Sequence, residues 1–230
     1  MNATISGSRK RGGFSLVEMA IVLAIVSLLL AGLLPTISGQ IEQQRRNETR
    51  KQLAEIQQAL LGFAIMNGRL PCPTTMANPA DATYGQEPAG GCAGVPAPPD
   101  GYLPWKTLGV SEIDAWGSKR TGAGDPWTGY WRYRVDRSYS NSLPFNLSTG
   151  FTDNLSVIDS GGNTITSGTE HPVAIVFSTG PNVTADGENS TANFNSVYQS
   201  DNPNPNFDDI LVWISRPQLF NRMVAAGKLP

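Results

Sequence analysis

The residues that metal centres and acid–base catalysis use most are scarce in this sequence of 230 residues. It contains one histidine, His171, and two cysteines, with no Cys-x-x-Cys pair. It also lacks a Gly-x-Ser-x-Gly motif and a glycine-rich phosphate loop. His171 precedes a proline at the start of an expected strand, where a structural role is the better interpretation. We therefore expect no enzyme.

Positive charge is scarce as well beyond the first few residues. The formal net charge is −2, and without Arg9, Lys10 and Arg11 the remaining chain would carry −5. Nucleic-acid binding needs a basic face, so we predict no nucleic-acid partner. The 24 glycines and 17 prolines indicate a body rich in loops.

A long apolar run follows the basic residues. Within residues 14–35 the only strongly polar side chains are those of Ser15, Glu18 and Ser27. Twenty helical residues cover roughly the 30 Å of a bilayer's hydrocarbon core, so residues 14–35 are predicted to form a transmembrane helix. The basic residues before it favour a cytoplasmic N-terminus. A cleaved secretory signal is the alternative, but no clean Ala-x-Ala site follows.

The stretch "KRGGFSLVEMAIVLAIVSLLLAGLLP" resembles the N-terminus of type IV pilins and of type II secretion pseudopilins. The resemblance implies that residues 1–13 are a cytoplasmic leader, which a prepilin peptidase cuts off between Gly13 and Phe14. It also implies N-methylation of Phe14. The subunit would wait in the inner membrane of a Gram-negative bacterium with its head in the periplasm. An assembly platform would then move it into a pilus or pseudopilus filament of many subunits.

Glu18 is the unusual residue of this segment, because a carboxylate inside a transmembrane helix costs on the order of 2.5–3.5 kcal/mol. One interpretation is that it reaches the headgroups of the lipid bilayer and has no further role. The family resemblance implies instead that it pairs with the Phe14 amine of another subunit, a contact that is strongest where water is scarce. We expect Glu18 to be unpaired in the single chain.

The pattern becomes amphipathic over residues 36–70, and a single helix is predicted from about residue 15 to residue 67. Pro35 is its weak point, either as a place where the helix bends or melts on assembly or as a kink at the membrane exit. Gly68 and Pro71 suit the end of the helix.

Residues 71–230 are predicted to form a globular head, which makes the fold α+β: a long helix whose second half packs against a small, mostly antiparallel sheet. Strands are expected at 129–136, 154–159, 171–180 and 208–215, with a short helix at 217–226. The tryptophan-rich residues 101–136 are interpreted as core and turn packing, with a carbohydrate platform as the alternative. Cys72 and Cys92 are interpreted as a disulfide, worth roughly 3 kcal/mol, rather than as two buried thiols.

The sequence from residue 178 to residue 209 has no hydrophobic period, and a loop of this length is either functional or mobile. Its acidic residues are Asp186, Glu188, Asp201, Asp208 and Asp209. Ca²⁺ binds such oxygen ligands on flexible loops. The ending "FDDILVW" resembles the calcium loop of major pseudopilins, which implies Asp208 and Asp209 as ligands. A solvated acidic loop is the alternative.

The sequence thus predicts a structural subunit of a type IV pilus-like filament. Three alternatives remain open. The chain could be a pseudopilin of a type II secretion system. It could be a minor pilin whose head is an adhesin or another ligand-binding module. It could also be a tethered enzyme with a coincidental leader.

Overall fold

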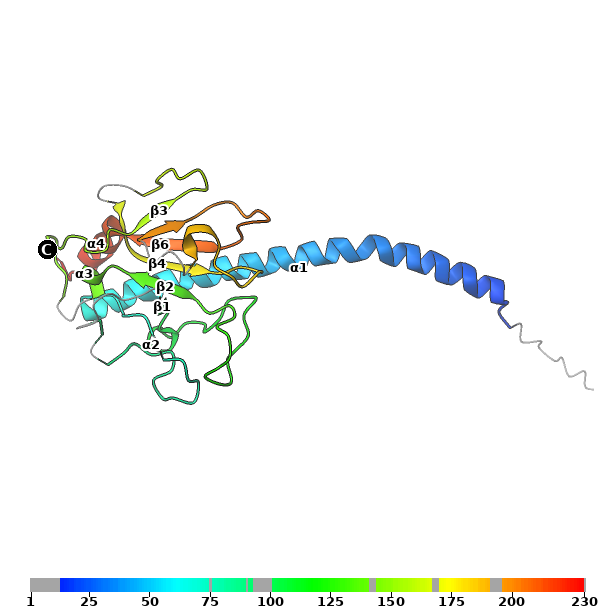
Figure 1. Ribbon diagram of the computed structural model, residues 1–230, viewed down its shortest axis with the longest axis horizontal. Coiled ribbons are helices and arrows are strands. Elements are labelled where there is room, and N and C mark those ends of the chain that lie inside the picture. The colour runs from blue at the N-terminus through cyan, green and yellow to red at the C-terminus, as the bar shows by residue number, and fades with distance from the viewer. Residues whose placement is uncertain are drawn as a thin grey trace, which may run out of the picture. The chain divides into compact units, whose positions relative to one another are not determined.

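The computed structural model describes residues 13–74, 76–89, 91–92, 101–140, 144–166, 170–190 and 196–229, without the side chains of residues 31–37. The chain divides into two compact units, Met1–Gln44 and Arg45–Pro230. Figure 1 shows the predicted α+β combination of one long helix and a mostly antiparallel sheet. The elements are α1 (Leu16–Asn67), β1 (Gly101–Tyr102), α2 (Trp105–Leu108), β2 (Arg132–Val135), α3 (Arg137–Ser140), β3 (Ser156–Ile158), β4 (Pro172–Ser178), η2 (Gly187–Asn189), β5 (Val197–Gln199), β6 (Ile210–Ser215) and α4 (Arg216–Ala225).

The long helix α1 has the bounds that the sequence predicts, within one residue at its start. Its first half is rich in Leu and Ala, which are strong helix formers. Pro35 lies within α1, but its side chain is outside the described residues. The predicted bend, melting or kink at Pro35 therefore stays a prediction. The prediction of a transmembrane helix at residues 14–35 includes positions whose side chains lie outside the described residues. In the part of the chain that is described, we find no helix that combines the length and the hydrophobicity of a membrane span.

The main sheet of the head has the strand order β1-β2-β4-β6, with every neighbouring pair antiparallel. β4 is buried at each of its positions, as expected for the middle strand that its continuous apolar run predicts. β3 and β5 form a separate parallel pair. Both β5 and η2 lie between residues 178 and 209, where the sequence shows no regular pattern. The prediction of an irregular loop was therefore wrong there.

The C-terminal half of α1 provides one wall of the core of the head. Leu53, Ile56, Leu60 and Ala64 recur at helical spacing and are all buried. They belong to one cluster with apolar side chains of the sheet, including Trp131, Tyr133, Val135, Val176 and Ile214. The Nε2 of Gln57 also donates to the carbonyl of Trp213 in β6, at 2.8 Å. The predicted packing of helix on sheet is thus present in the Arg45–Pro230 unit.

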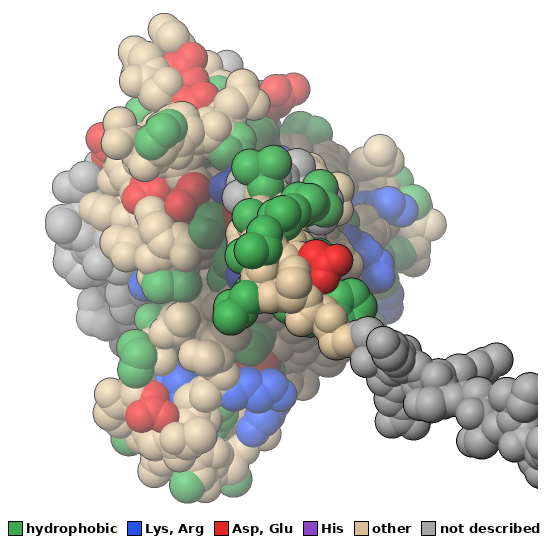
Figure 2. Space-filling view, turned by 90° about the vertical axis from the view of Figure 1, so that its right-hand side faces the viewer, with side chains coloured by type: hydrophobic (Ala, Val, Ile, Leu, Met, Phe, Trp, Pro, Cys, Tyr) green, Lys and Arg blue, Asp and Glu red, His purple; other side chains and the backbone are tan. Residues whose placement is uncertain are grey.

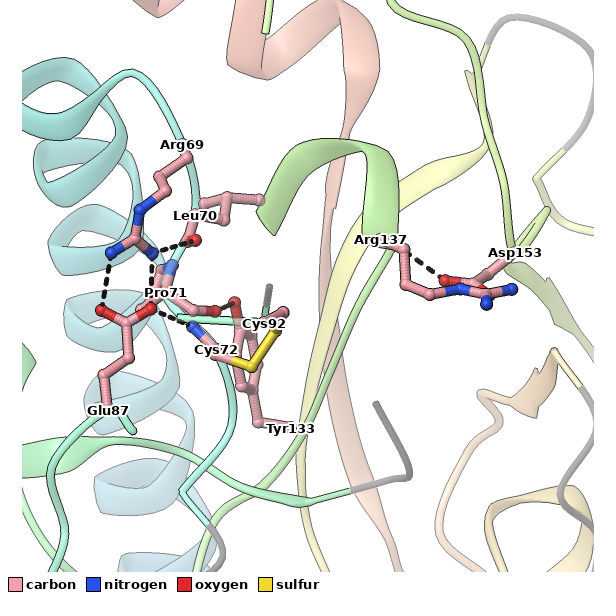
Figure 3. Close-up of a disulfide and its surroundings, with 9 residues drawn as sticks. All are labelled: Arg69, Leu70, Pro71, Cys72, Glu87, Cys92, Tyr133, Arg137 and Asp153. Carbon is pink, nitrogen blue, oxygen red and sulfur yellow. Dashed lines mark hydrogen bonds and ion pairs between the residues drawn. A yellow bond between two sulfur atoms is a disulfide. The ribbon is translucent and has the colours of Figure 1, made fainter. Parts of the chain in front are cut away.

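Two independent links close the loop that follows α1 (Figure 3). The predicted disulfide joins Cys72 to Cys92, with a Cα–Cα distance of 5.4 Å. Beside it, the guanidinium of Arg69 forms a two-point ion pair with the carboxylate of Glu87. The same carboxylate accepts a hydrogen bond from the backbone N–H of Cys72. The ion pair therefore holds the loop next to one of the two cysteines.

The start of α4 gives a test of the local structure. The side chain of Ser215 caps this helix by accepting from the backbone N–H of Gln218, at 3.4 Å. Ser215→Ala should lower the free energy of unfolding by about 1 kcal/mol. In a domain of this size the melting temperature should fall by roughly 2–4 °C, measured by circular dichroism. Ser215→Asp keeps a capping oxygen and should melt close to the wild type; an equal loss in both variants would contradict the capping role.

Candidate functional site

Gly13 and Phe14 lie just ahead of the first turn of α1, and 80% of the Phe14 surface is exposed. A Cβ added to Gly13 would meet no described atom within 4 Å. Among the described residues, none would clash with a side chain at position 13.

Ser15 and Glu18 form a reciprocal cap at the start of α1. The backbone N–H of Ser15 donates to Oε2 of Glu18 at 2.8 Å, and the backbone N–H of Glu18 donates to Oγ of Ser15 at 3.2 Å. This is a capping box, in which each side chain satisfies an N–H group that the helix leaves unpaired. The carboxylate of Glu18 is therefore hydrogen-bonded within its own helix, although no described residue supplies a cation to it. The spacing Ser-x-x-Glu before an apolar run is the sequence signal that predicts this cap.

The other polar side chain of the apolar segment is also satisfied locally. Oγ of Ser27 donates to the carbonyl of Leu23, one turn earlier, at 2.7 Å. Around these residues the surface is apolar and exposed, with Leu16 90% and Leu28 77% accessible. Figure 2 shows hydrophobic side chains gathered on this end of the helix. Such a surface can enter an apolar environment without losing a side-chain hydrogen bond, although the charge of Glu18 enters with it.

A second candidate site lies in the long loop of the head. Oxygen atoms of Asp186, Asp208 and Asp209 approach one another within 4.8 Å, which is close enough to share one cation. Asp209 is 3% exposed, and its Oδ2 accepts from the backbone N–H of Asp186 at 3.0 Å and from Nδ2 of Asn189 at 2.9 Å. Its Oδ1 is buried and has no hydrogen-bond partner among the described residues. A buried carboxylate oxygen of this kind is suited to a metal ion.

The electrostatics of this site are unfavourable for a bare carboxylate. Burial is the main cause that raises the pKa of Asp209 to about 7. The hydrogen bonds from Asp186 and Asn189 oppose that rise, and the negative charges of Asp186 and Asp208 add to it. The loop from residue 178 to residue 209 contains no lysine or arginine that could offset these charges. A divalent cation would remove both the repulsion and the cost of burial.

The structure brings together only part of the acidic set that the sequence contains. Asp208 and Asp209, the two predicted ligands, lie beside Asp186, which had no special role in the prediction. Asp201 lies outside this cluster and accepts from the backbone N–H of Ser160 at 2.9 Å. The sequence reasoning also missed Asn189, which is fully buried and orients Asp209. Its side chain further accepts from the backbone N–H of Gln199 in β5, a contact that no sequence pattern indicates.

The tryptophan-rich stretch forms core, as its preferred interpretation predicts. Tyr84, Trp105 and Tyr130 are buried in one cluster, with Trp127 packed against them. His171 has a structural contact, in which Nδ1 lies 2.9 Å from the carbonyl oxygen of Leu155.

The comparison with known families identifies one part of the chain. Residues 8–34 match the prokaryotic N-terminal methylation motif, the prepilin-type cleavage and methylation segment of type IV pilins and pseudopilins. The chain therefore carries the segment that defines pilin-like and pseudopilin subunits, as the sequence reasoning predicts. No curated protein and no solved structure matches the chain.

Proposed function

We propose that this chain is a structural subunit of a type IV pilus-like filament. The observation that carries the proposal is the methylation motif at residues 8–34, continued by the exposed apolar surface of α1. Exposed apolar area of this extent favours burial against other subunits. In this proposal the first part of α1 assembles the filament, and the head is its outer part.

Glu18 is the residue that we propose aligns the subunits. Its Oε2 takes part in the cap with Ser15, and no described residue donates to its Oε1. After cleavage before Phe14, the new α-amine of a neighbouring subunit can donate to that second oxygen. The cap and the contact between subunits are therefore compatible.

Processing can be tested directly at the N-terminus. We expect the mature chain, isolated from cells that contain a prepilin peptidase, to begin at Phe14 with one added methyl group. Without the peptidase, the chain should keep residues 1–13. N-terminal sequencing and intact mass measurement give both results. A mature chain that begins at any other residue would overturn the proposal.

A pseudopilus of a type II secretion system is the second candidate, and the acidic cluster of the head favours it. Major pseudopilins, which the end of this loop resembles, bind calcium in the corresponding loop. We propose that Asp186, Asp208 and Asp209 hold a calcium ion, because their oxygens converge and the buried Oδ1 of Asp209 has no partner in the described part of the chain. The ion would stabilise the head.

A further inference from the structure

A cavity of about 230 Å³ lies in the head between the aromatic residues near β1 and β2 and the loop that follows β4. Its floor includes Tyr102 and Trp127, and Arg132 of β2 contributes the one charged side chain among its lining residues. The loop after β4 contributes the rest of the lining, here called the loop wall: Thr179, Val183, Thr184, Ala185 and Ser190. All these residues belong to the Arg45–Pro230 unit. None of the three aspartates of the acidic cluster lines this cavity.

The aromatic floor is layered. The rings of Tyr102 and Trp127 stack with centroids 3.8 Å apart, at an angle of 12°. The guanidinium of Arg120 lies 4.1 Å from the Trp127 ring, and that of Arg132 lies 5.1 Å from the Tyr102 ring. Because Tyr102 occupies one face of Trp127, Arg120 covers the other. A ligand in the cavity therefore meets the edge of the Trp127 ring, which carries the positive end of the aromatic quadrupole and favours an anion.

Arg132 has no anionic partner among the residues that the structure describes, and its buried Nε has no hydrogen-bond acceptor. Arg134, two residues further along β2, differs in lying 3.6 Å from the carboxylate of Asp153. A guanidinium held over an aromatic ring, without a counter-ion, presents a planar fork of donors to a carboxylate. The cation of the cavity is thus available to a ligand.

The loop wall supplies neutral polar groups. Thr179, Thr184 and Ser190 bring hydroxyl groups to the lining, and Val183 and Ala185 bring apolar surface. Val183 has a φ of 53°, a left-handed conformation that is rare for a β-branched residue. Its side chain is nevertheless 41% exposed, so burial of this side chain does not explain the strained conformation. Hydroxyl groups beside small apolar patches match the mixed surface of a sugar ring.

We propose that this cavity binds an acidic saccharide, through one sugar ring that carries a single carboxylate. Arg132 pairs with the carboxylate, and the hydroxyl groups of the loop wall bind the hydroxyl groups of the sugar. The cavity volume suits one ring rather than a chain of rings. The acidic residues of the neighbouring loop, which has no lysine or arginine, disfavour ligands with several negative charges, such as phosphate esters.

The test is a titration of the full-length chain in detergent with methyl galacturonoside and methyl glucuronoside, observed through the indole N–H signals in NMR spectra. We expect saturable binding of at least one acidic glycoside, in the millimolar range. The neutral methyl galactoside and acetate should each bind at least about tenfold more weakly. Arg132→Gln should weaken binding of the acidic glycoside by at least about tenfold. Arg222→Gln, which removes the same charge from an exposed position on α4, should have no effect.

A second variant tests the cavity independently, in case Arg132→Gln does not fold. Thr184 is exposed at the cavity, so Thr184→Trp should fill the space without changing the core, and it should abolish binding at an unchanged melting temperature. Absence of binding of both acidic glycosides to the wild type would overturn the proposal. Binding that survives both variants would do the same. Equal binding of acetate would show a simple anion site and overturn the saccharide part.

Discussion

Glu18→Gln should lower the fraction of the subunit found in filaments by at least about a hundredfold, because removing one partner of a buried ion pair costs roughly 3–5 kcal/mol. In the filament that we propose, the apolar surface around Glu18 would be buried against other subunits, so an α-amine left without its carboxylate would be poorly solvated. Glutamine keeps the size of the side chain and removes only its charge. The loss therefore measures the contribution of the charge.

Glutamine is the informative replacement because it separates the two roles of this side chain. In the structure Glu18 also caps α1 through Ser15. Glutamine serves in a capping box about as well as glutamate, so Glu18→Gln leaves the cap in place. Ser15→Ala makes the opposite change: it removes the hydroxyl of the cap and leaves the carboxylate. It should cost about 1 kcal/mol at the helix start and leave assembly largely intact.

The measurement compares sheared filaments with the cell-associated pool, by immunoblot, in cells that produce the rest of the assembly machinery. N-terminal processing is checked in each variant, because an uncut subunit would fail to assemble for another reason. Normal assembly of Glu18→Gln would refute the pairing role. Equal loss in Glu18→Gln and Ser15→Ala would show that the cap, rather than the charge, is what assembly requires.

Local sequence patterns predict those parts of the chain whose conformation is determined by neighbouring residues. The ends of α1 follow from a capping sequence and from Gly68, whose φ is 69°. β4 follows from a continuous apolar run, and the disulfide follows from there being only two cysteines. In the first cases the residues that determine the structure lie within a short stretch of sequence. For the disulfide, the chain offers only one possible pair of cysteines.

The parts that the sequence does not reveal depend on contacts between distant residues. β5 has three residues, too few to show a period, and it exists because it pairs in parallel with β3 some forty residues earlier. Asp186 lies beside Asp208 and Asp209 because the chain folds back on itself between them, and the backbone N–H of Asp208 donates to the carboxylate of Asp186. Likewise, Arg132 and Thr184 line one cavity although about fifty residues separate them. Such sites arise from topology, which local patterns do not contain.

Calcium should raise the melting temperature of the head by roughly 5–10 °C at pH 8. A ligand present at a hundred times its dissociation constant stabilises the folded state by about 2.7 kcal/mol. In a domain of this size each kcal/mol shifts melting by roughly 2–4 °C. Thermal unfolding of the full-length chain, with calcium and then with excess chelator, measures the shift. A melting temperature at pH 8 that neither calcium nor chelator changes would dispose of the site.

The pH dependence of stability gives a further test because the pKa of Asp209 is raised on folding. It is raised to about 7 in the folded chain, above the ordinary value near 3.9 in an unfolded chain. The folded state therefore binds the extra proton, and this contribution to stability is complete below about pH 4 and is lost as the pH rises to about 7. Without calcium, the head should become less stable over that interval. Calcium has to displace the proton, so its stabilising effect should be larger at pH 8 than at pH 6.

Asp209→Asn distinguishes a calcium site from a solvated acidic loop. Asparagine keeps an oxygen that can accept from the backbone N–H of Asp186, but it removes the buried charge. In the absence of calcium, this variant should be more stable than the wild type at pH 8, and its melting should no longer respond to calcium. Asp201→Asn removes an equal charge from the same loop outside the cluster and should keep the full response. If both variants keep the response, the ion binds elsewhere. If only Asp209→Asn loses it, the buried carboxylate of Asp209 is a ligand of the ion.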